Sequence, residues 1–216
     1  LRTPLAVLDG HINLLLRWGK DDPKQLTESL EASRQEIKKI SNMIQDMLDI
    51  ARLKHTDNSE LEQISVACSM SELVTNFRIV HPTFDIELEN KLISPGIAQL
   101  HQNHYIQAVT ILLDNAVKYS GKIGNYIKVT LSEDDDMIIT KVLDHGLGIC
   151  KEDQSYIFER FFRADKARNR EIGGTGLGLA IIDNIAQIYK GSISVESQVG
   201  QGSIFTFRIT KDKKKT

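Results

Sequence analysis

The sequence predicts an α+β protein in which a helical hairpin precedes a two-layer sandwich of helices and mostly antiparallel strands. Two observations carry this prediction. Up to residue 53, apolar side chains recur three and four positions apart, as on an amphipathic helix. Beyond residue 61, short strand-like runs interleave with helical segments. We expect one domain over residues 1–56 and a second over residues 57–216, separated near the polar stretch 55–59.

The second helix of the hairpin has a coiled-coil-like seam. Spacings of three and four alternate through Leu30, Ser33, Ile37, Ile40, Ile44, Met47 and Ala51. A shorter stripe, Leu5, Leu8, Ile12 and Leu15, precedes a break at residues 19–23. Because a lone hairpin cannot bury both stripes, we expect a homodimer built on a four-helix bundle. The alternative is that the hairpin packs on its own downstream domain.

The second domain alternates short strands with three helices. Strands are expected at residues 61–66, 84–88, 126–131, 137–143, 192–196 and 203–209. Helices are expected at residues 71–80, 103–118 and 175–189, the first with Ser69 and Glu72 placed as a capping box. This alternation is typical of a two-layer sandwich.

Composition argues against several classes of function. Lys and Arg number 27 against 29 Asp and Glu, a net charge of −2, so we expect no nucleic-acid partner. Cys68 and Cys150 lack CxxC spacing, which disfavours a zinc site and a disulfide framework and fits a reducing compartment. No run approaches the roughly 20 apolar residues of a membrane span, and we expect no membrane contact by this stretch. Since it begins without Met, we expect a fragment of a longer protein.

Three segments carry candidate chemistry, and the first lies at the end of the helix expected from residue 103. Asn115, Lys118 and Tyr119 stand at positions i, i+3 and i+4, so an amide, an ammonium and a ring share one face. An amide oxygen can ligate Mg²⁺, an ammonium can meet a phosphate, and a ring can flank a base. Taken singly, each also fits an exposed helical side chain.

The second segment follows an apolar strand and contains Asp144, Gly146 and Gly148. An ionised carboxylate only accepts hydrogen bonds, so at a strand end it can take the exocyclic amine of adenine. The two glycines let the backbone approach a ligand without interference from a Cβ. Alone, the pattern DxGxG also fits an ordinary turn.

The third segment is a glycine-rich stretch at residues 173–180 that opens a helix. Clustered glycines expose N–H groups at a positive helix terminus, which suits a polyphosphate. The stretch matches neither the P-loop pattern nor the Rossmann fingerprint. We expect the polar residues 163–172, between the two glycine segments, to form a mobile lid over a nucleotide.

In this order, the segments NAVKYS, DHGLG, IFERFFR and GGTGLGLA resemble the N, G1, F and G2 boxes of the bacterial sensor histidine kinases. The opening LRTPL resembles the end of that family's H box, HELRTPL. The resemblance covers essentially the whole chain. It implies a Bergerat-type ATP-binding sandwich behind a dimerisation and phosphoacceptor hairpin, with ATP and Mg²⁺ as ligands. It also implies a response regulator as partner and a place in the cytoplasmic portion of a membrane sensor.

The resemblance assigns roles to individual positions. It makes Asn115 a ligand of Mg²⁺ and Asp144 the residue that reads adenine. The residues implied to bind the nucleotide are Asn115, Lys118, Tyr119, Asp144, Gly146, Gly148, Arg160, Arg163, Gly174, Thr175, Gly176, Leu177, Gly178 and Thr206. Thr3 lies where the family carries a residue that supports the reverse, phosphatase reaction.

Two departures from the family pattern stand out. Ile111 occupies the position, one turn before Asn115, where many members carry a further Asn. The phosphoacceptor His belongs two residues before Leu1, so we expect this fragment to bind ATP and dimerise without phosphorylating itself. Two alternatives remain open: another enzyme of the same ATP-binding fold, such as an ATPase or a protein serine kinase, and a catalytically silent dimerisation scaffold.

Overall fold

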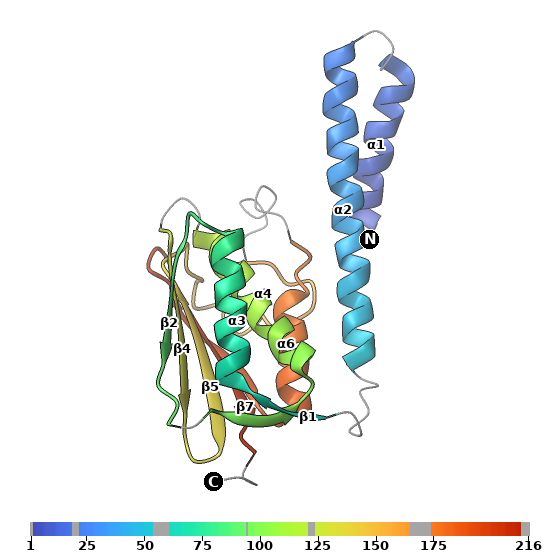
Figure 1. The fold of residues 1–216 in the computed structure, drawn as a ribbon. Helices are drawn as coiled ribbons and strands as arrows, with labels where there is room; N and C mark the ends of the chain where they lie inside the picture. Colours follow the sequence, from blue (N-terminus) through green and yellow to red (C-terminus); the bar gives the residue numbers. More distant parts are fainter. Residues whose placement is uncertain are drawn as a thin grey trace.

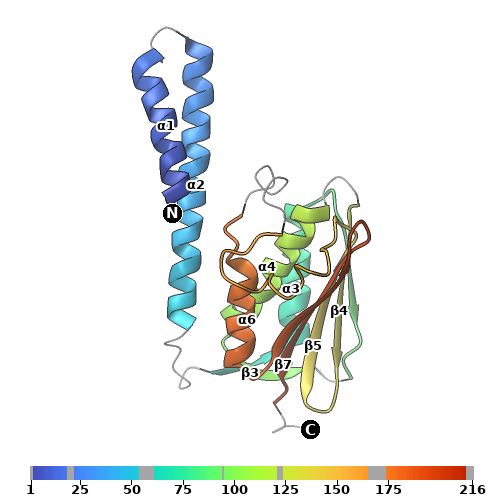
Figure 2. The ribbon, with the colours of Figure 1, turned by 180° about the vertical axis from the view of Figure 1, so that it is seen from behind.

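The computed structural model of the chain describes residues 2–18, 22–53, 61–93, 95–120, 124–164 and 174–212. Within these ranges the chain forms a helical hairpin beside a two-layer sandwich, which confirms the predicted fold class (Figures 1 and 2). The sheet, the helices that cover it and the hairpin follow one another across the molecule. The hairpin therefore lies against the helical side of the sandwich.

The hairpin consists of α1 (Arg2–Trp18) and α2 (Pro23–Leu53). Asp22 caps α2, because its Oδ1 accepts the backbone N–H groups of Lys24 at 2.9 Å and Gln25 at 3.2 Å. Figure 1 shows α2 continuing past α1 alongside the sandwich.

Many apolar side chains of the hairpin are exposed in the single chain: Leu5, Val7, Ile12, Leu14, Leu16, Leu26, Leu30, Ile37, Ile44 and Leu48. Leu30, Ile37 and Ile44 belong to the predicted seam. One chain therefore leaves only part of that seam uncovered, because Ser33 is buried and Met47 packs against the core of the chain's own second domain. The dimer stays a prediction.

The main sheet has five strands. Their spatial order is β2 (Asp85–Asn90), β4 (Tyr126–Glu133), β5 (Met137–Asp144), β7 (Gly202–Thr210) and β6 (Ser192–Gln198). β2 runs parallel to β4, and the other neighbours are antiparallel. A separate two-stranded sheet pairs β1 (Glu62–Ser65) with β3 (Ile97–Leu100).

Three helices cover one face of the main sheet: α3 (Val66–Val80), α4 (Gln102–Ser120) and α6 (Gly178–Ile188) (Figures 1 and 2). α4 buries one face, formed by Tyr105, Ala108, Val109, Leu112, Leu113 and Ala116. That spacing of three and four is what an amphipathic helix on a sheet requires. The opposite side of α4 is thereby left for polar residues.

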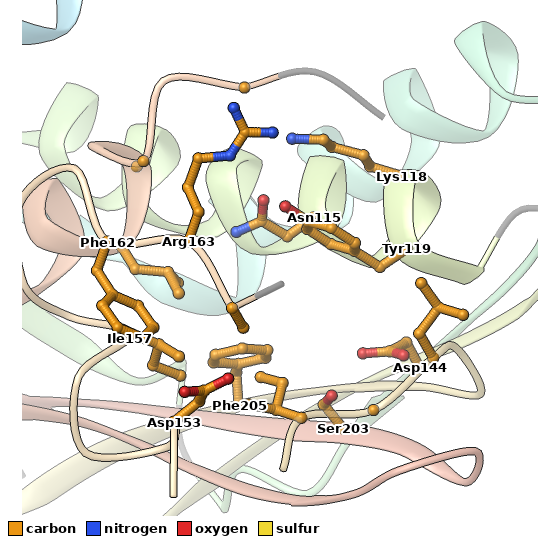
Figure 3. Close-up of a pocket in the computed structure, with 18 of the residues that line it drawn as sticks. Asn115, Lys118, Tyr119, Asp144, Asp153, Ile157, Phe162, Arg163, Ser203 and Phe205 are labelled. Atoms are coloured by element: carbon orange, nitrogen blue, oxygen red, sulfur yellow. The ribbon is translucent and has the colours of Figure 1, made fainter. Parts of the chain in front are cut away.

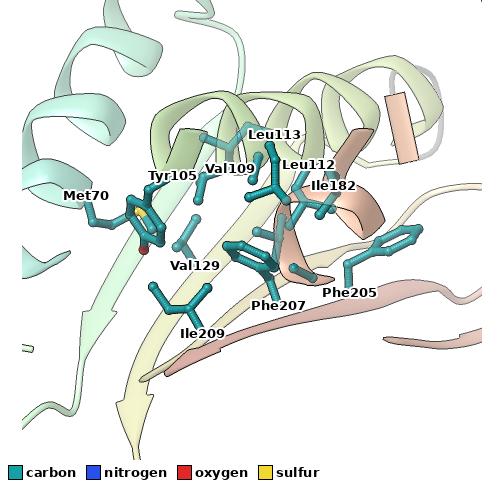
Figure 4. Packing of buried hydrophobic residues seen from close by; sticks show 14 of the residues in the cluster. Met70, Tyr105, Val109, Leu112, Leu113, Val129, Ile182, Phe205, Phe207 and Ile209 are labelled. Carbon is teal, nitrogen blue, oxygen red and sulfur yellow. The ribbon is translucent and has the colours of Figure 1, made fainter. Parts of the chain in front are cut away.

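The core lies between these helices and the alternate residues of the strands (Figure 4). The rings of Tyr105 and Phe207 stack with centroids 6.2 Å apart. The hydroxyl of Tyr105 is hydrogen-bonded to Thr140 Oγ1 at 2.9 Å, and each of the two residues is 1% exposed. The core therefore contains two buried hydroxyl groups that are hydrogen-bonded to each other.

The start of α3 differs from the prediction. The helix begins at Val66, and its N-cap is Ser65, whose hydroxyl accepts the N–H of Cys68 at 3.4 Å. Ser69 is buried inside the helix, so the capping box predicted for Ser69 and Glu72 was wrong. The physical reason is that β1 ends directly at Ser65, and the first available hydroxyl caps the helix.

One strand and one further helix boundary differ from the prediction. β3 was not predicted, because its four residues follow Pro95 and Gly96 and are too few to show a pattern. α6 begins at Gly178 and not at residue 175, since Gly174 and Gly176 adopt φ values of +123° and +73° that no helix contains.

We predict that the Tyr105–Thr140 pair behaves as one unit in unfolding. Tyr105→Phe and Thr140→Val should each lower the free energy of unfolding by about 1–3 kcal/mol, because each leaves a buried hydroxyl without its partner. The double variant should lose clearly less than the sum of the two, as urea denaturation of all four proteins would show. Strictly additive losses would contradict the coupling.

Candidate functional site

A cavity of about 390 Å³ opens between α4, the loop after β5 and the loop before α6 (Figure 3). Most of the residues singled out from the sequence line it. They are Asn115, Lys118, Tyr119, Asp144, Gly148, Arg163, Gly174, Thr175, Gly176 and Gly178. Segments far apart in the sequence therefore meet around one space, as the motif analysis predicts.

The exposed side of α4 supplies the polar wall. Asn115, Lys118 and Tyr119 are all half-buried there, directly beside residues that α4 packs into the core. Lys118 Nζ lies 4.9 Å from the centroid of the Tyr119 ring. The ammonium also reaches the glycine-rich loop, because a Cβ added at Gly174 would lie 2.3 Å from Lys118 Nζ.

Two cations share one end of the cavity. Figure 3 shows the Lys118 ammonium and the Arg163 guanidinium turned toward each other. Burial lowers the pKa of Lys118, and the positive charge of Arg163 lowers it further. Partial desolvation beside a like charge disfavours the protonated lysine, and the negative charge of a bound anion would offset both effects. This end of the cavity is therefore suited to a polyanion.

Asp144 marks another side of the cavity, at the end of β5. It is 5% exposed, and its Oδ1 accepts the N–H of Gly146 at 2.8 Å. Burial raises the pKa of Asp144, while the hydrogen bond from Gly146 opposes that rise. In Figure 3 the carboxylate is turned toward the cavity, where it can accept a hydrogen bond from a ligand amine.

Glycines hold the surrounding loops closely packed. A Cβ at Gly146 would lie 2.6 Å from Tyr119 O and 2.7 Å from Asp144 Oδ1, so any larger residue would displace the carboxylate. Gly148 has φ +68°, and a Cβ there would lie 2.0 Å from Gln198 O. Gly176 O accepts the N–H of Phe161 at 2.8 Å, which ties the glycine-rich loop to the segment before Arg163.

Several predicted residues do not line the cavity. Gly146 packs against Asp144 and the backbone of Tyr119 and does not line the cavity itself. Arg160 is exposed, and Leu177 is fully buried beneath the loop, so neither side chain lies at the surface of the cavity. Thr3 lies in α1, but its side chain is outside the described residues. Residues 165–172 of the predicted lid, which was expected at residues 163–172, are also outside them.

Thr206 lies on the wrong face of β7 for the role it was given. Ser203 and Phe205 line the cavity, and alternate residues of a strand point to opposite faces. Thr206 is paired with Lys141 and Ser194, both exposed, on the face away from the helices. Thr206 is therefore not among the residues that line the cavity, whereas Phe205, one residue earlier, is.

The apolar wall of the cavity and two acidic residues in its lining were not predicted from the sequence. The wall includes Ile149, Ile157, Phe162, Leu179, Val199 and Phe205. Nothing in the sequence distinguishes these from core residues, although the pairing of Asp144 with Ser203 makes β7 a neighbour of the carboxylate. The missed acids are Asp153 and Asp46, and Asp46 comes from α2. The apolar side chains suit a flat ring, and Asp144 suits an amine. Lys118 and Arg163 suit a polyanion.

Two family models match the chain. One, described as "His Kinase A (phospho-acceptor) domain", matches residues 1–56. The other, described as "Histidine kinase-, DNA gyrase B-, and HSP90-like ATPase", matches residues 101–213.

Curated relatives are similar over nearly the whole chain. The signal transduction histidine-protein kinase ArlS of Staphylococcus haemolyticus is 38% identical over 208 residues, which is 95% of this chain. ArlS of Staphylococcus aureus strain USA300 is 36% identical over the same length. The chain spans 45% of the length of each of these relatives.

Solved structures share the fold. The Acinetobacter baumannii histidine kinase AdeS aligns with a TM-score of 0.71 at 23% identity, over 99% of this chain and 98% of that one. Full-length ShkA in complex with AMPPNP aligns with a TM-score of 0.68 at 22% identity, over 87% of this chain and 39% of that one. None of the helices in the described ranges combines the length and apolar character needed to cross a membrane.

The raised pKa of Asp144 gives the stability a pH dependence of known sign. The pKa of the Asp144 carboxyl is raised above its ordinary value of 3.8 in the folded protein. Folded Asp144 therefore binds its proton more tightly than Asp144 in the unfolded chain does. The contribution of Asp144 to the free energy of unfolding should therefore fall as pH rises from about 3.8 to the raised pKa. The Asp144→Asn variant has no carboxyl at this position and does not lose this contribution. The free energy of unfolding of the variant, relative to that of the unchanged protein, should therefore increase from about pH 3.8 to the raised pKa and then level off.

Chemical denaturation of both proteins between about pH 3.5 and 7 measures this difference. A relative stability of Asp144→Asn that decreases with rising pH would mean that the hydrogen bond from Gly146 outweighs burial.

Proposed function

The chain belongs to the bacterial sensor histidine kinases, and from this premise we propose that it is the kinase core of a two-component signalling protein. In this proposal it binds Mg-ATP and directs the γ-phosphoryl group to a histidine, from which an aspartate of a response regulator receives it. The observation that carries the proposal is the division of the cavity. Lys118 and Arg163 occupy one end, an apolar wall follows, and Asp144 stands apart from the cations.

Each part of ATP has a matching part of the cavity. The exocyclic amine of adenine would donate to Asp144, and the base would lie between Tyr119 and the apolar residues near Phe205. The phosphates would lie toward Lys118, Arg163 and the glycine-rich loop. The structure of ShkA is of a complex with AMPPNP, and we propose an adenine nucleotide for this chain as well.

The residues present fit a magnesium ion that is shared with phosphate. Among the described residues, no three His, Cys, Asp or Glu side chains gather into a metal site. Asn115 lines the cavity and can offer its amide oxygen, while the Ile111 side chain has no oxygen and packs beside Gly178. Mg²⁺ commonly takes few protein ligands and keeps several waters. When bound, the ion would neutralise charge on the phosphates.

The phosphoryl step needs a histidine brought in line with the γ-phosphorus. We propose that the histidine lies two residues before Leu1, as the H-box remnant implies. Thr3 follows it by four residues and would orient water in the reverse reaction. Lys118 and Arg163 would meanwhile stabilise negative charge on the transferring group.

We further propose a homodimer through the uncovered stripe of the hairpin, with Leu30, Ile37 and Ile44 in the seam. The family resemblance supports a cytoplasmic position in a parent protein that carries a separate sensor region. The domain boundary proposed between residues 56 and 57 falls in residues 54–60, outside the described ranges.

Phosphorylation of a chain extended by His-Glu before Leu1 tests the function. With Mg-ATP labelled at the γ-phosphate, the extended chain should acquire label that is labile in acid and stable in base, as a phosphohistidine is. The unextended chain, and a chain extended by Ala-Glu, should remain unlabelled because they lack the acceptor. Equal labelling of all three proteins, or of none, would contradict the proposed reaction.

A further inference from the structure

The hairpin contributes to the lining of the cavity. Of the described residues that line the cavity, Asp46 alone belongs to α2. Its Oδ2 accepts a hydrogen bond from Thr175 Oγ1 at 2.6 Å. The same hydroxyl oxygen accepts the N–H of Leu177 at 3.2 Å, so Thr175 also fixes the backbone that leads into α6. Asp46 therefore holds the glycine-rich loop from outside the sandwich.

The position of Asp46 is set by an extensive contact. Ile50 and Leu53 of α2 are buried in the core cluster, and Met43 and Met47 pack against it. Their spacing places them on one face of α2, which lies beside α6 in Figures 1 and 2. One turn further along α2, Asp49 Oδ2 accepts a hydrogen bond from Gln107 Nε2 of α4 at 2.7 Å. The carboxylate of Asp46 is thus held in place by contacts on both sides.

This carboxylate faces the part of the cavity that suits an anion. Burial raises the pKa of Asp46, while the hydrogen bond from Thr175 opposes the rise, so the site is partly desolvated. A negative charge in such surroundings repels a second negative charge more strongly than it would in water. Phosphates placed against the glycine-rich loop would meet that repulsion while α2 is seated.

We propose that Asp46 is a positioning residue through which the hairpin opposes the binding of nucleotide phosphates. With α2 seated against α6, its carboxylate holds Thr175 and disfavours a triphosphate beside the loop. A bound triphosphate in turn favours withdrawal of α2, because a coupling between two binding events acts equally in both directions. This inference rests on the proposed nucleotide site and adds that the position of the hairpin sets its affinity.

Substitutions at Asp46 and Asp49 separate charge from structure. Asp46→Asn removes the charge but keeps an oxygen that can accept from Thr175, and Asp46→Glu keeps the charge. Asp49→Asn makes the same charge change on the same helix, keeps an acceptor for Gln107, and lies outside the cavity lining. The charge of Asp49 also raises the pKa of Asp46, so this variant controls for the loss of a neighbouring negative charge on α2.

Calorimetry with adenosine, ADP and Mg-ATP on the complete 216-residue chain provides the measurement. Asp46→Asn should bind Mg-ATP about tenfold more tightly, ADP by a smaller factor, and adenosine within about twofold of the unchanged protein. Asp46→Glu and Asp49→Asn should stay within about threefold for all three ligands. Amide hydrogen exchange in residues 43–53 should rise when Mg-ATP is added, since the proposal has α2 leave its seat.

The outcomes are distinguishable. Equal tightening for adenosine and ATP, or no tightening in Asp46→Asn, overturns the role of Asp46 while leaving nucleotide binding intact. Weaker Mg-ATP binding by Asp46→Asn also overturns it, because the carboxylate would then favour the bound nucleotide and not oppose it. Increased protection of residues 43–53 on adding Mg-ATP contradicts the withdrawal of α2. Failure of every protein to bind any adenine ligand contradicts the proposed function, and this inference with it.

Discussion

The packing of α4 against the sheet is the constraint on which the rest of the structure depends. One face of the helix is buried around Tyr105, Leu112 and Leu113, and this fixes its rotation about its axis. Asn115 and Lys118 must then face the cavity, since they stand on the other side of the same turns. The site needs no flexible element to place these two groups. Their positions follow from an apolar contact that also stabilises the domain.

Two charged groups in the cavity have pKa values shifted in directions that a bound nucleotide would oppose. Lys118 has a lowered pKa beside Arg163, and Asp144 has a raised pKa at the end of β5. Burial disfavours the charged form of both groups. Phosphate near the cations and an amine at Asp144 would favour the charged forms. The directions of these two pKa shifts therefore agree with the geometry on which the proposed ligand rests.

How far the sequence predicts this protein depends on whether a feature is local. The face shared by Asn115 and Lys118 follows from helical spacing, and Asp144 follows from its place after an apolar strand; both were found. The face of Thr206 depends on strand register, where a shift of one residue reverses every side chain. β3 pairs with β1 across a separation of more than 30 residues, and four residues carry too little pattern to reveal it. Asp46 reaches the cavity only because α2 docks on α6, which no local pattern encodes.

The central claim is that adenine is read at Asp144 and phosphates at Lys118, and calorimetric titration of Mg-ATP measures it most directly. Asp144→Asn and Lys118→Met should each weaken binding by at least about tenfold, since each removes a charged hydrogen-bonding partner of the ligand. Thr206→Val, on the far face of β7, should leave the affinity unchanged. Affinity that survives both of the first two substitutions, or that is lost with Thr206→Val, would contradict the account.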